Sequence, residues 1–541
     1  MSKPALFFRI WLPRVLALLL CLHLSRGLLP FTAVEGDDQG VVNGLQAWIR
    51  GTGDFREAGY LYSIQPGSYH VLYTLTRVSG LPSLSVYCAV SALAAGAFIV
   101  LASLLLARAT GLRFAWVLVA LLLTPELISG ACYANTNTLA GAMAMGGLII
   151  AQSARGRGAY WRAGLFLGLG AWLRMDSLLL APVVLPLRLA CGSPRRALLE
   201  TAEIALVTLL TLLVVCAAVH TPLTAAWREF SQRKNFNVMQ MLWVNGWLAL
   251  GVVATVAGLF GLGHLIRHQR WWLLGVVAAG SAPCLLVYGG NFTTPKYLYY
   301  AAPFLILPGL AWLQALLSDD TGRPRQNSRL AFSVVALFAI EAVFGVQTSS
   351  AAFRRFDPAP PFLVLHSSVI RNKRIQLGLG EGEIIPTDDG PRLRGGQFWA
   401  PQMWRREKTA MHEEMIRLDA LLTDQPPELL LTSTYLAYQV AGGWLRDHAF
   451  QLGSPRTIED NPTSFVVDCH GSKHSLQLVQ VNHTEADARE FASSIQPGQQ
   501  ALFLNDLGGI GFRHLAAELR GWRLLSPSEN QLLTTYAYPS P

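Results

Sequence analysis

The sequence contains a long series of apolar runs, most of which have the length needed to cross a bilayer as a helix. The chain has 541 residues, of which 52% are hydrophobic and only 14% are charged. A soluble protein usually has about a quarter of its residues charged. These features predict a polytopic α-helical membrane protein. The runs cover, approximately, residues 7–29, 83–107, 114–129, 136–153, 201–219, 241–264, 272–289, 297–317 and 330–347.

One further apolar stretch, residues 163–189, is too long for a single span and is interrupted by the sequence LRMDS. We interpret it as two short half-helices that meet near Arg174. Such a hairpin is allowed at membrane depth only where its polar turn faces protein or a water-filled cavity. With this hairpin the chain has about eleven membrane segments.

The basic residues lie mainly in alternate connections between the runs rather than in one stripe. The net charge of +9 is therefore a topology signal and does not indicate nucleic-acid binding. Placing these groups on the cytoplasmic side of the plasma membrane leaves residues 30–82 and 348–541 outside. The groups are Lys3/Arg9/Arg14, Arg108/Arg113, Arg155/Arg157/Arg162, Arg188/Arg195/Arg196, Arg267/Arg270 and Arg323/Arg325/Arg329.

The two ends of the chain differ in character. The first apolar run is interpreted as an uncleaved span, because Phe31 stands where signal cleavage needs a small residue. Residues 348–541 contain short apolar stretches that alternate with helical patterns at 404–422 and 511–520, which predicts a soluble α/β domain. The predicted domains are therefore a membrane domain, 1–347, and an extracytoplasmic domain, 348–541.

The long outer loop, residues 30–82, begins with the acidic sequence EGDDQG. The next segment has a helical spacing of Val42, Leu45 and Ile49, which is compatible with a helix lying in the membrane interface. Asp37 and Asp38 then stand at the start of that helix, where a carboxylate is stabilised as an anion. Such a carboxylate can act as a general base toward a hydroxyl. The alternative is that Asp38 only caps the helix.

Several cations are also expected at the outer face, against the usual topology bias. They are Arg56, Arg174, Arg228, Arg233, Lys234 and Lys296. One reason for such charges is an anionic lipid phosphate that leaves during group transfer. For Arg233 and Lys234 contact with lipid headgroups explains the charge equally well. Arg174 indicates function, because a charge at membrane depth is costly without a partner. Asp176 is a candidate partner and would make the pair structural.

Three blocks of the sequence together suggest a known family. The first block runs from Asp38 through Gly53-Asp54 to YLYSIQPGSYHVLY, the second is GLFLGLGAWLRMDSLLLAPVVLPL and the third is PKYLYYAAPFLILPGL. In this order they resemble the GT-C superfamily of polyprenyl-phosphate-sugar-dependent membrane glycosyltransferases. The likeness is to the branch that contains bacterial lipid A aminoarabinose transferases and protein O-mannosyltransferases. The second block is similar to that family's broken hairpin, and the third to an element at the start of a late span.

This resemblance implies roles for individual residues. Asp38 takes the place of the catalytic acid, with Asp37 as the near alternative. The resemblance and the position of the cations give Lys296, Tyr300, Arg174 and Arg56 as ligands of the donor phosphate. The first block gives Tyr62, Gln65, Tyr69 and His70 as substrate-binding candidates. The chain departs from the family at Gln65, where the family has a lysine, and at Val41 and Val42, where it has a basic and an aromatic residue.

The implied reaction moves a sugar from a polyprenyl-phosphate donor to an acceptor hydroxyl on the outer face, with inversion. The acceptor class stays open between glycan, lipid and protein. No cofactor is required by this chemistry, although the adjacent acids offer an alternative in which a divalent cation is bound. No metal site is assigned. A polytopic transporter or flippase that uses Arg174, Asp176 and Glu341 is the main alternative, and a membrane-anchored binding protein acting through residues 348–541 is another.

Overall fold

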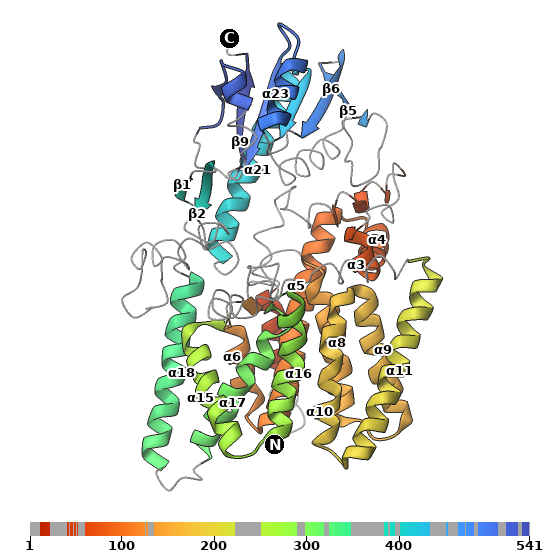
Figure 1. The fold of residues 1–541 in the computed structure, drawn as a ribbon, viewed down its shortest axis with the longest axis vertical. Helices are drawn as coiled ribbons and strands as arrows, with labels where there is room; N and C mark the ends of the chain where they lie inside the picture. Colours follow the sequence, from red (N-terminus) through yellow and green to blue (C-terminus); the bar gives the residue numbers. More distant parts are fainter. Residues whose placement is uncertain are drawn as a thin grey trace.

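The protein, described by a computed structural model, consists of a helical bundle and a seven-stranded sheet (Figure 1). The sheet lies beyond the end of the bundle at which helices α3 (Tyr60–Ile64) and α4 (Pro66–Ser79) are found. The structure describes residues 11–21, 41–51, 60–127, 135–221, 250–288, 298–318, 324–347, 383–394, 401–432, 451–452, 464–480, 485–506, 515–527 and 533–539, with a few single positions or pairs omitted.

The helices of the bundle follow the apolar runs. Helices α5 (Ser83–Thr110), α8 (Asn137–Ser153) and α16 (Trp271–Tyr288) coincide with three expected runs. Helix α11 (Pro194–Ala218) begins before the expected residue 201, at a proline in its first turn. The other helices are α6 (Phe114–Leu122), α9 (Arg157–Leu173), α10 (Val184–Leu189), α15 (Val252–Arg267), α17 (Ala302–Leu317) and α18 (Pro324–Gln347).

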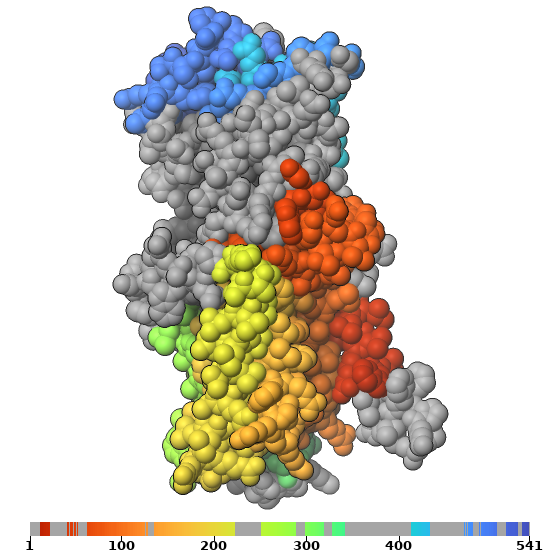
Figure 2. Space-filling view, turned by 90° about the vertical axis from the view of Figure 1, so that its right-hand side faces the viewer, coloured from red at the N-terminus to blue at the C-terminus, as the bar shows by residue number. Residues whose placement is uncertain are grey.

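Among the described helices, α5 and α11 are long and apolar enough to cross a membrane. They occupy different environments: 67% of the most apolar part of α5 is buried, against 22% for α11. Figure 2 shows α11, in yellow, running along the surface of the bundle. Its outward side chains are leucine and valine, among them Leu206, Leu209 and Val214. An apolar outer surface of this extent is suited to contact with lipid rather than water.

The predicted hairpin is present, and its two arms are longer than half-helices. Helix α9 has 17 residues and is about 26 Å long. The returning arm is a 3₁₀ segment, η3 (Met175–Val183), followed by α10. Because a 3₁₀ helix rises about 2 Å per residue, this arm also extends about 27 Å with fewer residues. The chain therefore returns to the end of the bundle at which α9 begins.

A buried polar cluster holds the hairpin together at that end. Arg188, near the end of α10, forms an ion pair with Glu200 of α11 and donates to the carbonyl oxygens of Ala151 and Ala154 at 2.9 and 3.2 Å. Tyr160 of α9 donates to the same Glu200 carboxylate. Arg188 and Glu200 are both buried, so the charges compensate each other away from solvent. The cluster fixes the starts of α9 and α11 side by side.

The helical segment at residues 41–49 differs from the expectation. Val41, Val42 and Leu45 are buried against α4 and α5 rather than turned toward a membrane interface. Trp48 packs against Tyr73 of α4. The apolar stripe predicted from the sequence is present in the structure. It packs against the apolar faces of α3 and α4 instead of facing lipid.

The sheet has the strand order β4-β5-β6-β3-β7-β9-β8. Strand β3 pairs in parallel with β6 and β7, and the other pairs are antiparallel. Its strands are β3 (Leu429–Thr432), β4 (Gln451–Leu452), β5 (Ser464–Cys469), β6 (Ser472–Gln480), β7 (Ala501–Asp506), β8 (Arg523–Leu524) and β9 (Leu533–Tyr538). Helices α21 (Pro401–Asp424) and α23 (Glu485–Ser494) and a hairpin, β1 (Glu383–Thr387) with β2 (Gly390–Arg394), complete the described part.

Close packing of α9 against α11 depends on two glycines one helical turn apart. A Cβ atom at Gly164 would lie 2.6 Å from the Val207 Cβ, and one at Gly168 would lie 2.6 Å from the Thr211 Cβ. Small residues at this spacing allow membrane helices to approach closely.

We predict that Gly168→Ala lowers the free energy of unfolding by about 1–3 kcal/mol, because the added methyl group overpacks the α9–α11 contact. Gly158→Ala is the matched control on the same helix, since a Cβ atom there meets nothing within 4 Å. The control is expected to be neutral or slightly stabilising. Denaturation midpoints of the detergent-solubilised variants measure the difference, and equal midpoints would contradict the packing account.

Candidate active site

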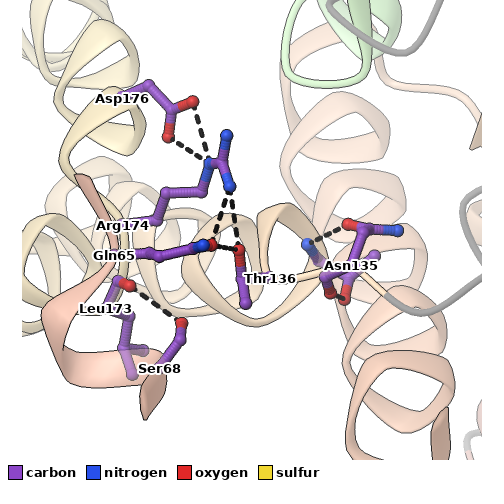
Figure 3. A network of polar contacts seen from close by, with 8 residues as sticks. Gln65, Ser68, Asn135, Thr136, Leu173, Arg174 and Asp176 are labelled. Atoms are coloured by element: carbon purple, nitrogen blue, oxygen red, sulfur yellow. Dashed lines mark hydrogen bonds and ion pairs between the residues drawn. The ribbon is translucent and has the colours of Figure 1, made fainter. Parts of the chain in front are cut away.

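The turn of the α9–η3 hairpin places Arg174 at the end of the bundle that lies nearest α4. Arg174 has an extended backbone, with φ −157° and ψ 121°, between two helical segments. Its backbone N–H still donates to Gly170 O at 2.9 Å, so the turn begins without a gap in the helix hydrogen bonds. The side chain lies at the centre of a polar network (Figure 3).

The Arg174 guanidinium group is held from two sides. Its Nε donates to both carboxylate oxygens of Asp176 at 3.0 Å. Its Nη1 donates to Gln65 Oε1 and to Thr136 Oγ1, each at 2.9 Å. The Thr136 hydroxyl donates in turn to Gln65 Oε1. One guanidinium group therefore connects the hairpin turn, the residue before α4 and the residue before α8.

A cation is tolerated at this buried position because Arg174 forms an ion pair with Asp176. The side chains of Arg174 and Asp176 are 15% and 6% exposed. In such an environment each charge would carry a desolvation cost of several kcal/mol without the other. Asp176 is therefore the partner that the sequence suggested, and the pair has no net charge.

Helix α4 is docked firmly onto the end of α9, which positions Gln65. Ser68 Oγ donates to Leu173 O at 2.8 Å. A Cβ atom at Gly67 would lie 2.6 Å from the Trp172 ring and 2.8 Å from the Trp172 carbonyl oxygen. Only glycine allows this approach without displacement. Pro66 follows Gln65 at the first position of α4, where its missing N–H has no helical acceptor in any case.

Thr136 is fixed by the start of α8. Asn135 Oδ1 accepts from the Thr138 backbone N–H at 3.1 Å, which caps the helix. Ser91 of α5 donates to Asn135 O at 2.9 Å and accepts from Asn135 N at 3.0 Å. The backbone beside Thr136 is thus held by α5 and α8 together. This contact was not found from the sequence, although the polar run NTNT before an apolar helix is a typical capping signal.

Four of the remaining site candidates from the sequence are described, and one of them, Tyr62, contacts two of the others. Tyr62 OH lies 3.2 Å from His70 Nε2 and 3.0 Å from Thr221 Oγ1. The His70 ring stacks on Trp172, with ring centres 6.1 Å apart. Tyr62 and His70 therefore adjoin the Arg174 turn through Trp172.

Tyr69 and Tyr300 are buried. Tyr69 is fully covered and packs edge-to-face on Tyr62, with ring centres 5.8 Å apart, which is a core position. Tyr300 is 3% exposed, and within the described part of the chain its hydroxyl group has no hydrogen-bond partner. Its ring packs on α8, since a Cβ atom at Gly141 would lie 2.9 Å from the Tyr300 ring.

The other candidates, Asp37, Asp38, Arg56 and Lys296, lie outside the described residues. Of the residues that the structure describes, no group of three His, Cys, Asp or Glu side chains is placed to hold a metal ion. The described site is thus a buried Arg174–Asp176 ion pair with two neutral hydrogen-bonding partners, Gln65 and Thr136.

We predict that Asp176→Asn lowers the free energy of unfolding by about 3–5 kcal/mol, because it leaves Arg174 buried without a counter-charge. The second change Arg174→Gln, made in the same chain, restores much of that loss. Arg489 and Glu518, 63% and 36% exposed and 3.1 Å apart, are the control pair, and Glu518→Gln costs about 0–1 kcal/mol. Equal losses from both single changes, measured by denaturation, would contradict a buried pair.

No protein-family model matches the sequence, and neither does any curated protein. Among solved structures, ArnT from Cupriavidus metallidurans bound to undecaprenyl phosphate matches at 13% identity and a TM-score of 0.52, over 98% of this chain and 97% of that chain. The same ArnT in the apo state matches at 15% identity and a TM-score of 0.54, over 99% of each chain. The likeness covers the sheet as well as the bundle. The chain therefore shares the fold of these ArnT structures, in agreement with the resemblance found in the sequence blocks.

Proposed function

We propose that this protein is a membrane glycosyltransferase, which moves a sugar from a polyprenyl-phosphate donor to an acceptor hydroxyl group on the outer face of the plasma membrane. The observation that carries the proposal is the full-length agreement in fold with ArnT, one structure of which is bound to undecaprenyl phosphate. The anchored Arg174 supports it, because it stands at one end of the bundle, where a lipid phosphate at the membrane surface can approach.

In the proposed reaction the acceptor oxygen attacks the anomeric carbon as the bond from that carbon to the phosphate oxygen breaks. The polyprenyl phosphate leaves with the bonding electron pair, and the Asp38 carboxylate takes the proton of the acceptor hydroxyl. Displacement from the opposite side inverts the configuration. Asp37 is the alternative base. Charge develops on the leaving phosphate, so cations held in place beforehand stabilise the transition state most effectively.

The neutral residue at position 65 determines which group supplies that charge. Gln65 stands where the family that the sequence resembles has a lysine, and it accepts a hydrogen bond from Arg174 instead of offering a charge. We infer that Arg174 is the phosphate ligand at this position, with Gln65 and Thr136 orienting its guanidinium plane. Lys296 and Arg56 supply further charge, and Tyr300 supplies a hydroxyl donor. Tyr62 and His70 contact the sugar.

The sheet lies beyond the same end of the bundle as α4 (Figure 1). We propose that this domain is extracytoplasmic and presents the acceptor. Incubation of the purified protein with a labelled polyprenyl-phosphate sugar tests the function, and separation of labelled lipid, glycan and protein identifies the acceptor. A flippase would move the labelled lipid between leaflets without forming any new glycosidic bond.

We predict that Asp38→Asn lowers the transfer rate by about 10²–10⁴-fold, since the amide cannot accept the proton. Single-turnover transfer from the labelled donor measures the effect. Asp424→Asn, at an exposed position at the end of α21, is the control and leaves the rate unchanged. Full activity in both Asp38→Asn and Asp37→Asn would rule out the proposed base.

We predict that Arg174→Gln lowers kcat/KM for the donor by about 10²–10³-fold, the effect of losing one preorganised donor to a developing anion. Arg174→Lys recovers only part of this loss, because an ammonium group lacks the planar set of donors that engages Asp176, Gln65 and Thr136 together. Arg489→Gln, on the sheet domain, controls for loss of an arginine. Unchanged kinetics in Arg174→Gln would show that the phosphate binds elsewhere.

A further inference from the structure

The end of the bundle opposite Arg174 carries a dense group of arginines, called here the arginine patch. It consists of exposed side chains in the first two turns of α9, in the first turn of α11 and two residues before α9. They are Arg155, Arg157, Arg162, Arg195 and Arg196. The Tyr160–Glu200 and Trp161–Glu203 hydrogen bonds join α9 to α11 within their first three turns, so the arginines of both helices belong to one surface.

The described residues compensate only part of the charge of the patch. Glu200 is already shared by Arg188 and Arg196, and Glu203 accepts from Trp161 Nε1 at 3.0 Å. Throughout the part of the chain that the structure describes, Arg155, Arg157, Arg162 and Arg195 have no carboxylate partner. Uncompensated guanidinium groups on neighbouring turns repel one another, and an anion bound between them relieves that repulsion.

The residues above the patch indicate what carries the anion. Trp161 is 59% exposed, and its hydrogen bond to Glu203 holds the ring across α9 and α11. Farther along the same surface lie exposed apolar side chains, among them Leu165, Leu206 and Leu209. Arginines are thus concentrated at the end of this surface, together with the exposed Leu198 and Leu199, Trp161 lies among them, and leucines continue beyond. In a phospholipid the phosphate likewise lies at one end, and the acyl chains continue beyond it.

We propose that the arginine patch and the adjoining α9–α11 surface bind one anionic glycerophospholipid of the inner leaflet, with its phosphate among the arginines and its chains along the leucines. This site is distinct from the proposed donor site, which lies at the other end of the hairpin, and it does not depend on the proposed reaction. Basic residues at a membrane end also direct topology. The same arginines serve both roles, so a comparison with arginines of other connections is needed to distinguish lipid binding from topology.

The test compares thermal stability of the detergent-purified full chain with added phosphatidylglycerol, phosphatidylcholine of the same chains, or soluble glycerophosphate. A ligand that binds the folded state stabilises it. We expect phosphatidylglycerol to raise the midpoint by on the order of 3–5 °C, and the other two additions to have little effect. Equal stabilisation by the zwitterionic lipid, or by glycerophosphate, would overturn the proposal of an anionic lipid site.

The deciding variant is Arg157→Gln with Arg162→Gln and Arg195→Gln. We expect its affinity for phosphatidylglycerol, measured by titration at low salt, to fall on the order of a hundredfold. Its midpoint without lipid is unchanged or higher, because repulsion is relieved. The control removes three exposed arginines from other connections, with Arg108→Gln, Arg113→Gln and Arg270→Gln. If the control loses affinity equally, the effect is one of total charge and the site does not exist.

Discussion

The bundle accommodates a cation at the turn of its broken hairpin, and the elements around that turn are arranged to make this possible. Asp176 follows Arg174 by two residues and neutralises it, while Gln65 and Thr136 come from distant parts of the chain. A buried ion pair is rarely more stable than apolar packing of the same volume. Removal of one partner, however, leaves the other charge buried and uncompensated, which is strongly destabilising. The desolvation cost of this pair has a function if the fixed guanidinium group binds a phosphate, as proposed above.

The arginines at the two ends of the hairpin differ in their partners and in their exposure. At one end Arg174 is enclosed by partners from α9–η3 and from the residues before α4 and α8. At the other end Arg188 is equally enclosed, by Glu200 and two carbonyl oxygens. That end also carries the arginine patch, most of whose members have no carboxylate partner among the described residues. Between the ends, α9 and α11 approach through Gly164 and Gly168 and expose leucine outward. This difference between the two ends agrees with the two proposals, in which the Arg174 end binds the donor phosphate and the arginine patch binds an anionic phospholipid.

The sequence predicted the bundle well because run length and the placement of basic residues follow from the thickness and charge preference of a membrane. It located the hairpin turn and Asp176, since a charge within an apolar run demands a nearby partner. It did not find Thr136 or the docking of Gly67 on Trp172, because contacts between residues far apart in sequence leave no local pattern. The stripe of Val41, Val42 and Leu45 was read correctly as apolar, but periodicity does not distinguish lipid from a protein partner.

The most direct measurement is a structure of the full chain with a polyprenyl-phosphate lipid bound. We expect a phosphate oxygen within about 3 Å of the Arg174 guanidinium group, with the Asp38 carboxylate facing the position of the transferred sugar. The guanidinium group would keep its bonds to Gln65 and Thr136. A phosphate bound away from this turn, or an Asp38 carboxylate directed away from it, would contradict the account.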